Sequence, residues 1–265
     1  MLGRLIIHEL RKKWKSSRNL LLGYGAVQVL LLFIIRVFLW NEGLIDGFSM
    51  GSDTSTNVSL GFGLLTTLFM MLALGIGAYP FVESMYRFER DLSGKQAYLE
   101  LMIPAAAWQK VLSKLIATLA SLAVCGTISL FSMFMFITVN SNFIYFKEFM
   151  DFIWQVISNE FLTCMVAIVL LLFAFASLYI MVFLCIAVAK SFTHKNTVAV
   201  PVGILAFILL TAVLAIADTQ INRFPIYTFS LLDINFSVSM IISNVVTFVL
   251  LLIGTSWLIE KRIEH

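Results

Sequence analysis

The amino-acid sequence predicts an all-α integral membrane protein with six transmembrane helices, and three observations support this fold class. Apolar residues make up 60% of the 265 residues and charged residues only 12%, whereas soluble domains carry about 25% charged residues. The chain contains six apolar stretches of about 20 residues or more, the length of helix that crosses a hydrocarbon layer about 30 Å thick. These stretches do not alternate polar and apolar side chains as barrel strands do, so helices are the expected spanning elements.

The first element expected along the chain is an amphipathic helix over residues 1–18 that lies on the membrane surface. Its apolar side chains share one face and six basic residues lie elsewhere, which is typical of an interfacial helix. A cleaved signal peptide fits less well, because the apolar run from Leu20 is too long and has no small-residue cleavage site. The residues expected to anchor this helix at the interface are Arg11, Lys12, Lys13, Trp14 and Lys15.

The six predicted spans follow the interfacial helix. They cover residues 20–40, 60–82, 115–139, 161–189, 198–217 and 238–259. Together they use most of the chain, so residues 1–265 are expected to form a single transmembrane domain without a separate soluble domain.

The distribution of Lys and Arg predicts the orientation of these spans. All but three of the 18 basic residues lie before the first span, between spans two and three, between spans four and five, or after span six. The exceptions are Arg36, Lys147 and Arg223. Because cytoplasmic loops are enriched in basic residues, both termini are expected in the cytoplasm of a multi-pass cell-membrane protein. The net charge of +3 reflects this topology and gives no reason to expect a nucleic-acid partner.

The interior of the predicted spans is poor in ionisable groups. It holds Arg36 and no Asp, Glu or His. Such groups at membrane depth mark proton relays, ion sites and intramembrane catalysis, so the sequence argues against an ion-coupled carrier or an intramembrane protease. The three cysteines lack metal-ligand spacing and the three histidines lie in basic or terminal segments, so no catalytic or metal site is predicted.

Residues 88–114, between the second and third spans, interrupt the apolar sequence with charges, a glycine and a proline. Residues 83–91 predict a charged turn. Residues 95–103 predict a short amphipathic helix about 14 Å long, too short to cross a bilayer. Gly94 is expected to mark its start and Pro104 its end, because proline cannot donate the next backbone hydrogen bond.

The residues after Pro104 are expected to begin the third span. Proline suits the first turn of a helix, where the backbone N–H has no partner within the helix. Lys110 and Lys114 are expected to anchor this helix at the lipid headgroups.

This segment resembles the cytoplasmic coupling loop of the membrane subunits of type 2 ABC exporters. That family tends to have Glu-Arg, a Gly, a short apolar helix ending in Leu-Pro, then Ser-Arg, and then Gly-Lys as the third membrane helix begins. The counterparts here are Glu89 and Arg90, Gly94, residues 97–102, Ile103 and Pro104, Ala106 and Ala107, and Ser113 and Lys114. The spacing matches throughout, whereas some identities differ: the Ser-Arg pair, for example, is replaced by two alanines.

The resemblance implies that the chain is a permease subunit. In that family a six-helix subunit pairs with an identical or homologous subunit in the lipid membrane. Each subunit binds a separate cytoplasmic ABC ATPase, which in turn binds ATP and Mg. This chain has no GxxxxGK[ST] phosphate loop, so it is not expected to be an enzyme or to bind a cofactor itself. The expected coupling contacts are Gly94, Tyr98, Leu99, Glu100, Leu101, Met102 and Pro104.

Two further expectations follow from the same resemblance. Residues 218–237 are expected to re-enter the outer leaflet, since they are apolar but broken by polar residues and a proline. Spans one, two and five are rich in Phe and Met, which suits a hydrophobic or amphipathic cargo such as a drug or an antimicrobial peptide, exported from or cleared off a bacterial membrane. The residues that bind cargo are not predicted.

Two other classes of function stay open. The chain could be a membrane scaffold or sensor without transport that recruits a cytoplasmic protein through residues 1–18 and 88–114. It could also be a membrane-embedded enzyme acting on lipid, but its nearest polar candidates are better explained as the charged turn. Those candidates are Glu83, Glu89, Arg90 and Asp91.

Overall fold

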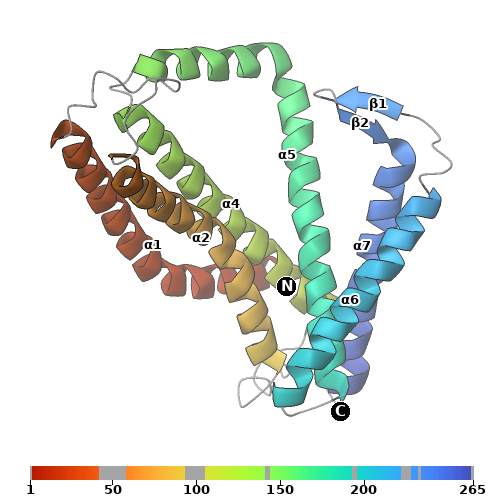
Figure 1. The fold of residues 1–265 in the computed structure, drawn as a ribbon. Helices are drawn as coiled ribbons and strands as arrows, with labels where there is room; N and C mark the ends of the chain where they lie inside the picture. The colour runs from red at the N-terminus through yellow and green to blue at the C-terminus, as the bar shows by residue number, and fades with distance from the viewer. Residues whose placement is uncertain are drawn as a thin grey trace. The chain divides into compact units, whose positions relative to one another are not determined.

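The fold is dominated by long helices. The computed structural model describes residues 2–41, 58–92, 105–140, 144–192, 196–221, 228–231 and 234–263. Within these ranges there are six long helices (Figure 1). They are α1 (Leu2–Asn41), α2 (Val58–Leu92), α4 (Ala107–Asn140), α5 (Ile144–Phe192), α6 (Asn196–Ile221) and α7 (Val238–Leu258).

Each of these helices contains a stretch that is long and apolar enough to cross a membrane. The six stretches are Leu2–Val37, Phe62–Leu92, Ala107–Val139, Phe161–Phe192, Ala199–Ile221 and Ile241–Lys261. Each overlaps one span expected from the sequence. The prediction of a membrane protein with six helical spans is therefore confirmed for the described ranges.

One β-hairpin is an exception to the all-helical prediction among the described residues. Strands β1 (Thr228–Leu231) and β2 (Ile234–Ser237) pair antiparallel, with Thr228 opposite Ser237 and Leu231 opposite Ile234. The hairpin leads directly into α7 (Figure 1). It occupies the second half of the segment expected to re-enter the outer leaflet, and α6 continues to Ile221 in the first half. Re-entry of this segment stays a prediction.

Several helices run further than the sequence analysis expected. Residues 2–18 are helical but continue without a break into the first span, since α1 is one helix of 40 residues. Residues 83–91 are not a turn, because α2 continues through them to Leu92. Helix α5 has 49 residues and begins at Ile144, well before the span expected from residue 161. The described part of the chain ends in a π-helical turn, η2 (Ile259–Ile263).

The chain divides into two compact units. Unit 1 comprises Met1–Glu9, Phe81–Leu119 and Leu162–His265, and unit 2 comprises Leu10–Pro80 and Ala120–Phe161. The boundary in α2 falls next to Pro80, which removes a backbone hydrogen bond inside that helix.

The core of unit 2 forms where α1, α2 and α4 lie side by side (Figure 1). Leu31 and Ile35 from α1 contact Phe69 from α2 and Phe136 from α4. The two phenylalanine rings lie 4.9 Å apart between their centroids. These contacts are made by the apolar stripe that each helix directs inward.

In unit 1, helices α6 and α7 pack against α5 through small residues. A Cβ atom added at Gly203 of α6 would lie 3.6 Å from the Cβ of Ala189, and one added at Gly254 of α7 would lie 3.5 Å from Leu184 Cδ1. Such glycines let membrane helices approach closely.

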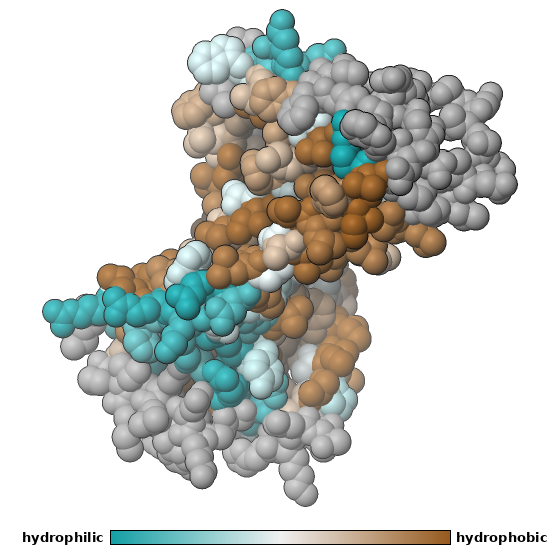
Figure 2. Space-filling model, turned by 90° about the vertical axis from the view of Figure 1, so that its left-hand side faces the viewer, coloured by the Kyte–Doolittle hydropathy of each residue, from teal (hydrophilic) through white to brown (hydrophobic). Residues whose placement is uncertain are grey.

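The outer surface is largely apolar. In the candidate span of α6 only 6% of the residues are buried, and side chains around the helix, such as Ile204 and Leu209, are exposed. Figure 2 shows brown, hydrophobic side chains over much of one face, with teal hydrophilic side chains gathered in groups. A soluble monomer rarely exposes so much contiguous apolar area, whereas a membrane protein presents it to lipid.

Candidate functional site

The seven residues expected to contact an ATPase, from Gly94 to Pro104, lie outside the described residues. The structure describes both flanks of that segment. On one side α2 ends at Leu92, and on the other α4 begins at Ala107. The carbonyl oxygen of Ala106 accepts hydrogen bonds from the backbone N–H groups of Gln109 (2.9 Å) and Lys110 (3.3 Å), which starts the first turn of α4. The prediction that a membrane helix begins soon after Pro104 is confirmed.

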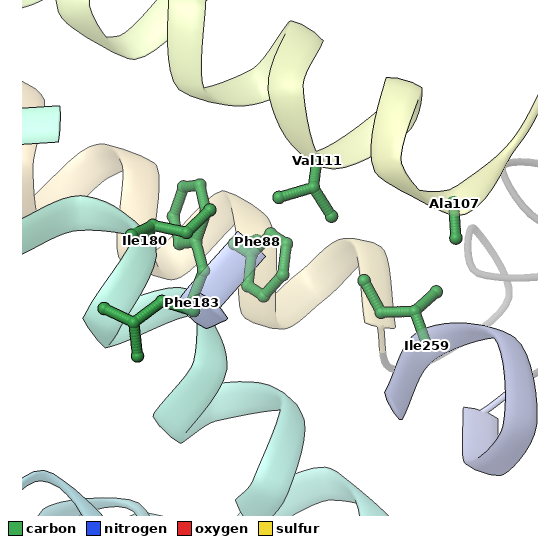
Figure 3. Packing of buried hydrophobic residues seen from close by; sticks show 7 residues of the cluster. Phe88, Ala107, Val111, Ile180, Phe183 and Ile259 are labelled. Carbon is green, nitrogen blue, oxygen red and sulfur yellow. The ribbon is translucent and has the colours of Figure 1, made fainter. Parts of the chain in front are cut away.

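A stacked pair of aromatic rings fixes the end of α2 to α5. The rings of Phe88 and Phe183 lie 4.2 Å apart with an angle of 11° between their planes. Both side chains are almost completely buried. Val111 from α4 and Ile259 from η2 belong to the same cluster and approach the Phe88 ring in Figure 3. The last turns of α2 are therefore packed against three other elements of unit 1.

Ion pairs lie beside this aromatic contact. Lys114 Nζ from α4 lies 3.3 Å from Glu9 Oε1 of α1 and is also hydrogen-bonded to Asp91 of α2. Lys190 Nζ from α5 lies 3.1 Å from Glu89 Oε1 of α2. We call these five residues, Glu9, Glu89, Asp91, Lys114 and Lys190, the loop-base cluster.

The loop-base cluster is mostly withdrawn from solvent. The side chains of Asp91 and Lys190 are only 3% and 5% exposed, whereas that of Glu89 is 32% exposed. Charges in such surroundings interact strongly, but removing one partner leaves a costly buried charge. The Glu89–Lys190 pair contributes less to stability, because water screens the charges of a partly exposed pair.

The other charges at the end of α2 interact within the helix. Arg87 donates to Glu83 Oε1 through Nε (2.9 Å) and Nη2 (2.7 Å), one turn apart. The guanidinium carbon of Arg90 lies 6.0 Å from the centroid of the Tyr86 ring. These contacts stabilise the helical conformation of residues that the sequence analysis placed in a turn.

The residues expected to anchor the N-terminal helix at the interface differ in exposure. Arg11, Trp14 and Lys15 are exposed and Lys12 is half-buried, but Lys13 is buried. The accessible members of the set are thus those on the outer face of α1. Their contact with lipid stays a prediction.

Lys114 was expected at the lipid headgroups, and this expectation is wrong. Its ammonium group binds two carboxylates from other helices, and its side chain is 13% exposed. Asp91 and Lys114 are 23 residues apart, and Glu9 is 105 residues from Lys114. No local pattern of the sequence therefore indicated these contacts.

The described residues hold no group of three or more His, Cys, Asp or Glu side chains that could bind a metal ion. The loop-base cluster itself pairs acids with bases, which suits a mechanical connection between helices. Comparison of the chain with protein-family models, with curated proteins and with solved structures found no match.

Proposed function

We propose that this protein is the membrane-spanning permease subunit of an ATP-driven ABC transporter, in which a separate ATPase subunit supplies the energy. In this proposal ATP and Mg bind the ATPase, and residues 94–104 contact it in the cytoplasm. A second six-helix subunit, identical or homologous, completes the path for a hydrophobic or amphipathic substrate such as an antimicrobial peptide or a drug.

The observation that carries the proposal is the loop-base cluster together with the Phe88–Phe183 stack. A coupling element works only if its displacement is transmitted to the membrane helices. A flexible connection to those helices would absorb the displacement. Residues 93–104 are flanked by α2 and α4, whose neighbouring turns are held by buried contacts. The end of α2 is bound to α5 through the stack, and the first turns of α4 are bound to α2 and to α1 through Lys114. Tightly packed elements move as rigid bodies, so a push on the segment would displace several helices together.

The first experiment identifies the partner. The full-length chain is purified in mild detergent from cells that express it at its native level, and the proteins that copurify are identified. We expect a stoichiometric ATPase of ordinary ABC size, whose hydrolysis in lipid nanodiscs changes when hydrophobic compounds are added. A stoichiometric cytoplasmic partner without ATPase activity would support the scaffold or sensor function instead.

The second experiment tests the coupling residues. The substitution Leu101→Asp places a charge on the apolar face of the expected helix and should uncouple ATP hydrolysis from transport without removing the protein from the membrane. Gln96→Asp is the matched control, because it adds the same charge on the opposite face. Normal transport by the Leu101→Asp variant would show that the helix or the function has been wrongly assigned.

A further inference from the structure

Buried polar atoms on three side chains of unit 2 have no hydrogen-bond partner among the described residues. They are the Tyr24 hydroxyl, both polar atoms of the Gln28 amide, and the Ser132 hydroxyl. Gln28 is 4% exposed and Ser132 is 9% exposed. All three lie inside apolar stretches that are long enough to span a membrane, where an unpaired polar group is especially unfavourable.

Gln28 and Ser132 lie at the same level of the helix bundle. Arg36 Nη1 of α1 donates to the carbonyl oxygen of Val139 of α4, at 3.1 Å, which fixes the register of the two helices. Both helices end at the same side of unit 2 (Figure 1). Gln28 stands eight residues before Arg36 along α1, and Ser132 stands seven residues before Val139 along α4. At the usual helical rise these separations are about 12 Å and about 11 Å.

The same two residues also belong to the faces of α1 and α4 that line the unit 2 core. Gln28 stands three and seven residues before Leu31 and Ile35, which are the α1 residues of the unit 2 core. Ser132 stands four residues before Phe136, the α4 residue of that core. Residues spaced by three, four or seven share one face of a helix, so both polar groups belong to helix faces that are directed into this core.

Helix α2 contacts α4 through small side chains one turn from Ser132. Ser129 Oγ, one turn from Ser132, donates to the carbonyl oxygen of Ala73 at 2.7 Å. A Cβ atom added at Gly77 would lie 3.7 Å from Ser129 Oγ. Tyr24 extends the polar layer by one turn along α1.

From these positions we propose that Gln28 and Ser132 form a binding site for a neutral hydrogen-bonding group of hydroxyl type. All of the available groups are uncharged, so an ion would gain too little to leave water. The amide offers an acceptor and two donors, and the Ser132 hydroxyl offers both functions. A single oxygen bound to both residues would satisfy them, because it can accept from one and donate to the other. That oxygen belongs to a water molecule or to the polar end of a membrane-soluble molecule.

The experiment measures what contacts the Gln28 amide. The full-length chain, labelled with nitrogen-15, is placed in nanodiscs, and the side-chain amide signal of Gln28 is assigned by its loss in the Gln28→Met variant. Magnetisation transfer to this amide is then recorded from water and, in a second sample with protonated lipid, from lipid protons. The exposed Gln155 of α5 is the reference for contact with bulk water.

Each outcome decides the proposal. Transfer from water identifies a bound water molecule, and transfer from lipid protons without water identifies a membrane-soluble ligand; both support the site. Transfer from neither source would overturn it. We also expect Ser132→Ala to abolish the transfer and to shift the Gln28 signal, whereas Ser243→Ala, at a buried serine of unit 1, should change neither. An unchanged Gln28 signal in the Ser132→Ala variant would show that the two residues do not share a site.

Discussion

Lys114 is the residue of the loop-base cluster whose loss should cost the most stability. It binds carboxylates from two other helices, Glu9 of α1 and Asp91 of α2. The substitution Lys114→Met keeps most of the length and the apolar body of the side chain while removing the charge. It leaves two acids, one of them only 3% exposed, without the ammonium group that compensates them here.

The expected loss follows from the burial of this pair. Breaking a fully buried ion pair costs about 3–5 kcal/mol, since the remaining charge has lost its partner. Lys114 and Glu9 keep 13% and 11% side-chain exposure, so we expect the lower end, about 3 kcal/mol. For a chain of this size that corresponds to a decrease in Tm of roughly 6–12 °C.

The assay is the thermal unfolding of the purified chain in one detergent, with two comparisons. Lys147→Met removes an exposed lysine of α5 and should change stability by no more than about 0.5 kcal/mol. Adding Asp91→Asn to the Lys114→Met variant removes a buried charge that has lost the Lys114 ammonium group, and should restore a large part of the stability. The reasoning is refuted if Lys114→Met is no more harmful than Lys147→Met, or if the double variant is less stable than Lys114→Met alone.

Five further substitutions at four positions test the packing of the two units by the same assay. Phe183→Ala removes one ring of the buried stack and should cost about 3–5 kcal/mol, whereas Phe192→Ala on the same helix, 71% exposed, should be nearly neutral. Arg36→Met removes the hydrogen bond from a cation to the last turn of α4 and should cost roughly 1.5–3 kcal/mol; a change as small as that of the exposed-lysine control would contradict this. Gly77→Ala should be tolerated, because its Cβ would meet only the Ser129 side chain, with Oγ at 3.7 Å and Cβ at 3.9 Å. The larger side chain of Gly77→Leu should not be tolerated.

The six membrane helices could be predicted because their signal is local. Each span is a run of apolar residues whose length matches the thickness of a bilayer, and no contact between distant residues is needed to recognise it. The helix ends were harder to predict. The charges of residues 83–91 suggested a turn, but Glu83 and Arg87 are four residues apart and pair on one helix face. That spacing is itself a helical signal, and it was overlooked.

The start of α5 was missed for a related reason. Residues 144–160 contain Lys147, Asp151 and other polar groups, so they do not resemble a span. Their large apolar side chains nevertheless recur every fourth residue, at Phe146, Met150 and Trp154, which is typical of an amphipathic helix. These three side chains are exposed.

The contacts of the candidate site could not be predicted from local sequence. Lys114 and Glu9 are 105 residues apart in the chain, and Lys190 and Glu89 are joined only because α5 packs against α2. A lysine at the end of a span usually reaches the headgroups, so an anchoring role was the natural expectation for Lys114. Which carboxylate lies within its reach depends on how the helices pack.

The two kinds of polar contact suggest how each unit resists rearrangement. In unit 1 the loop-base cluster joins helix ends through charges that are mostly buried, and separating them leaves a buried charge without that partner. In unit 2 the core residues Phe69 and Phe136 and the Ser129–Ala73 hydrogen bond lie within spans, where a lost contact finds no water to replace it. We therefore expect the parts of α1, α2 and α4 in unit 2 to move as one body, and the adjoining ends of α2 and α4 in unit 1 to move together when residues 93–104 are displaced.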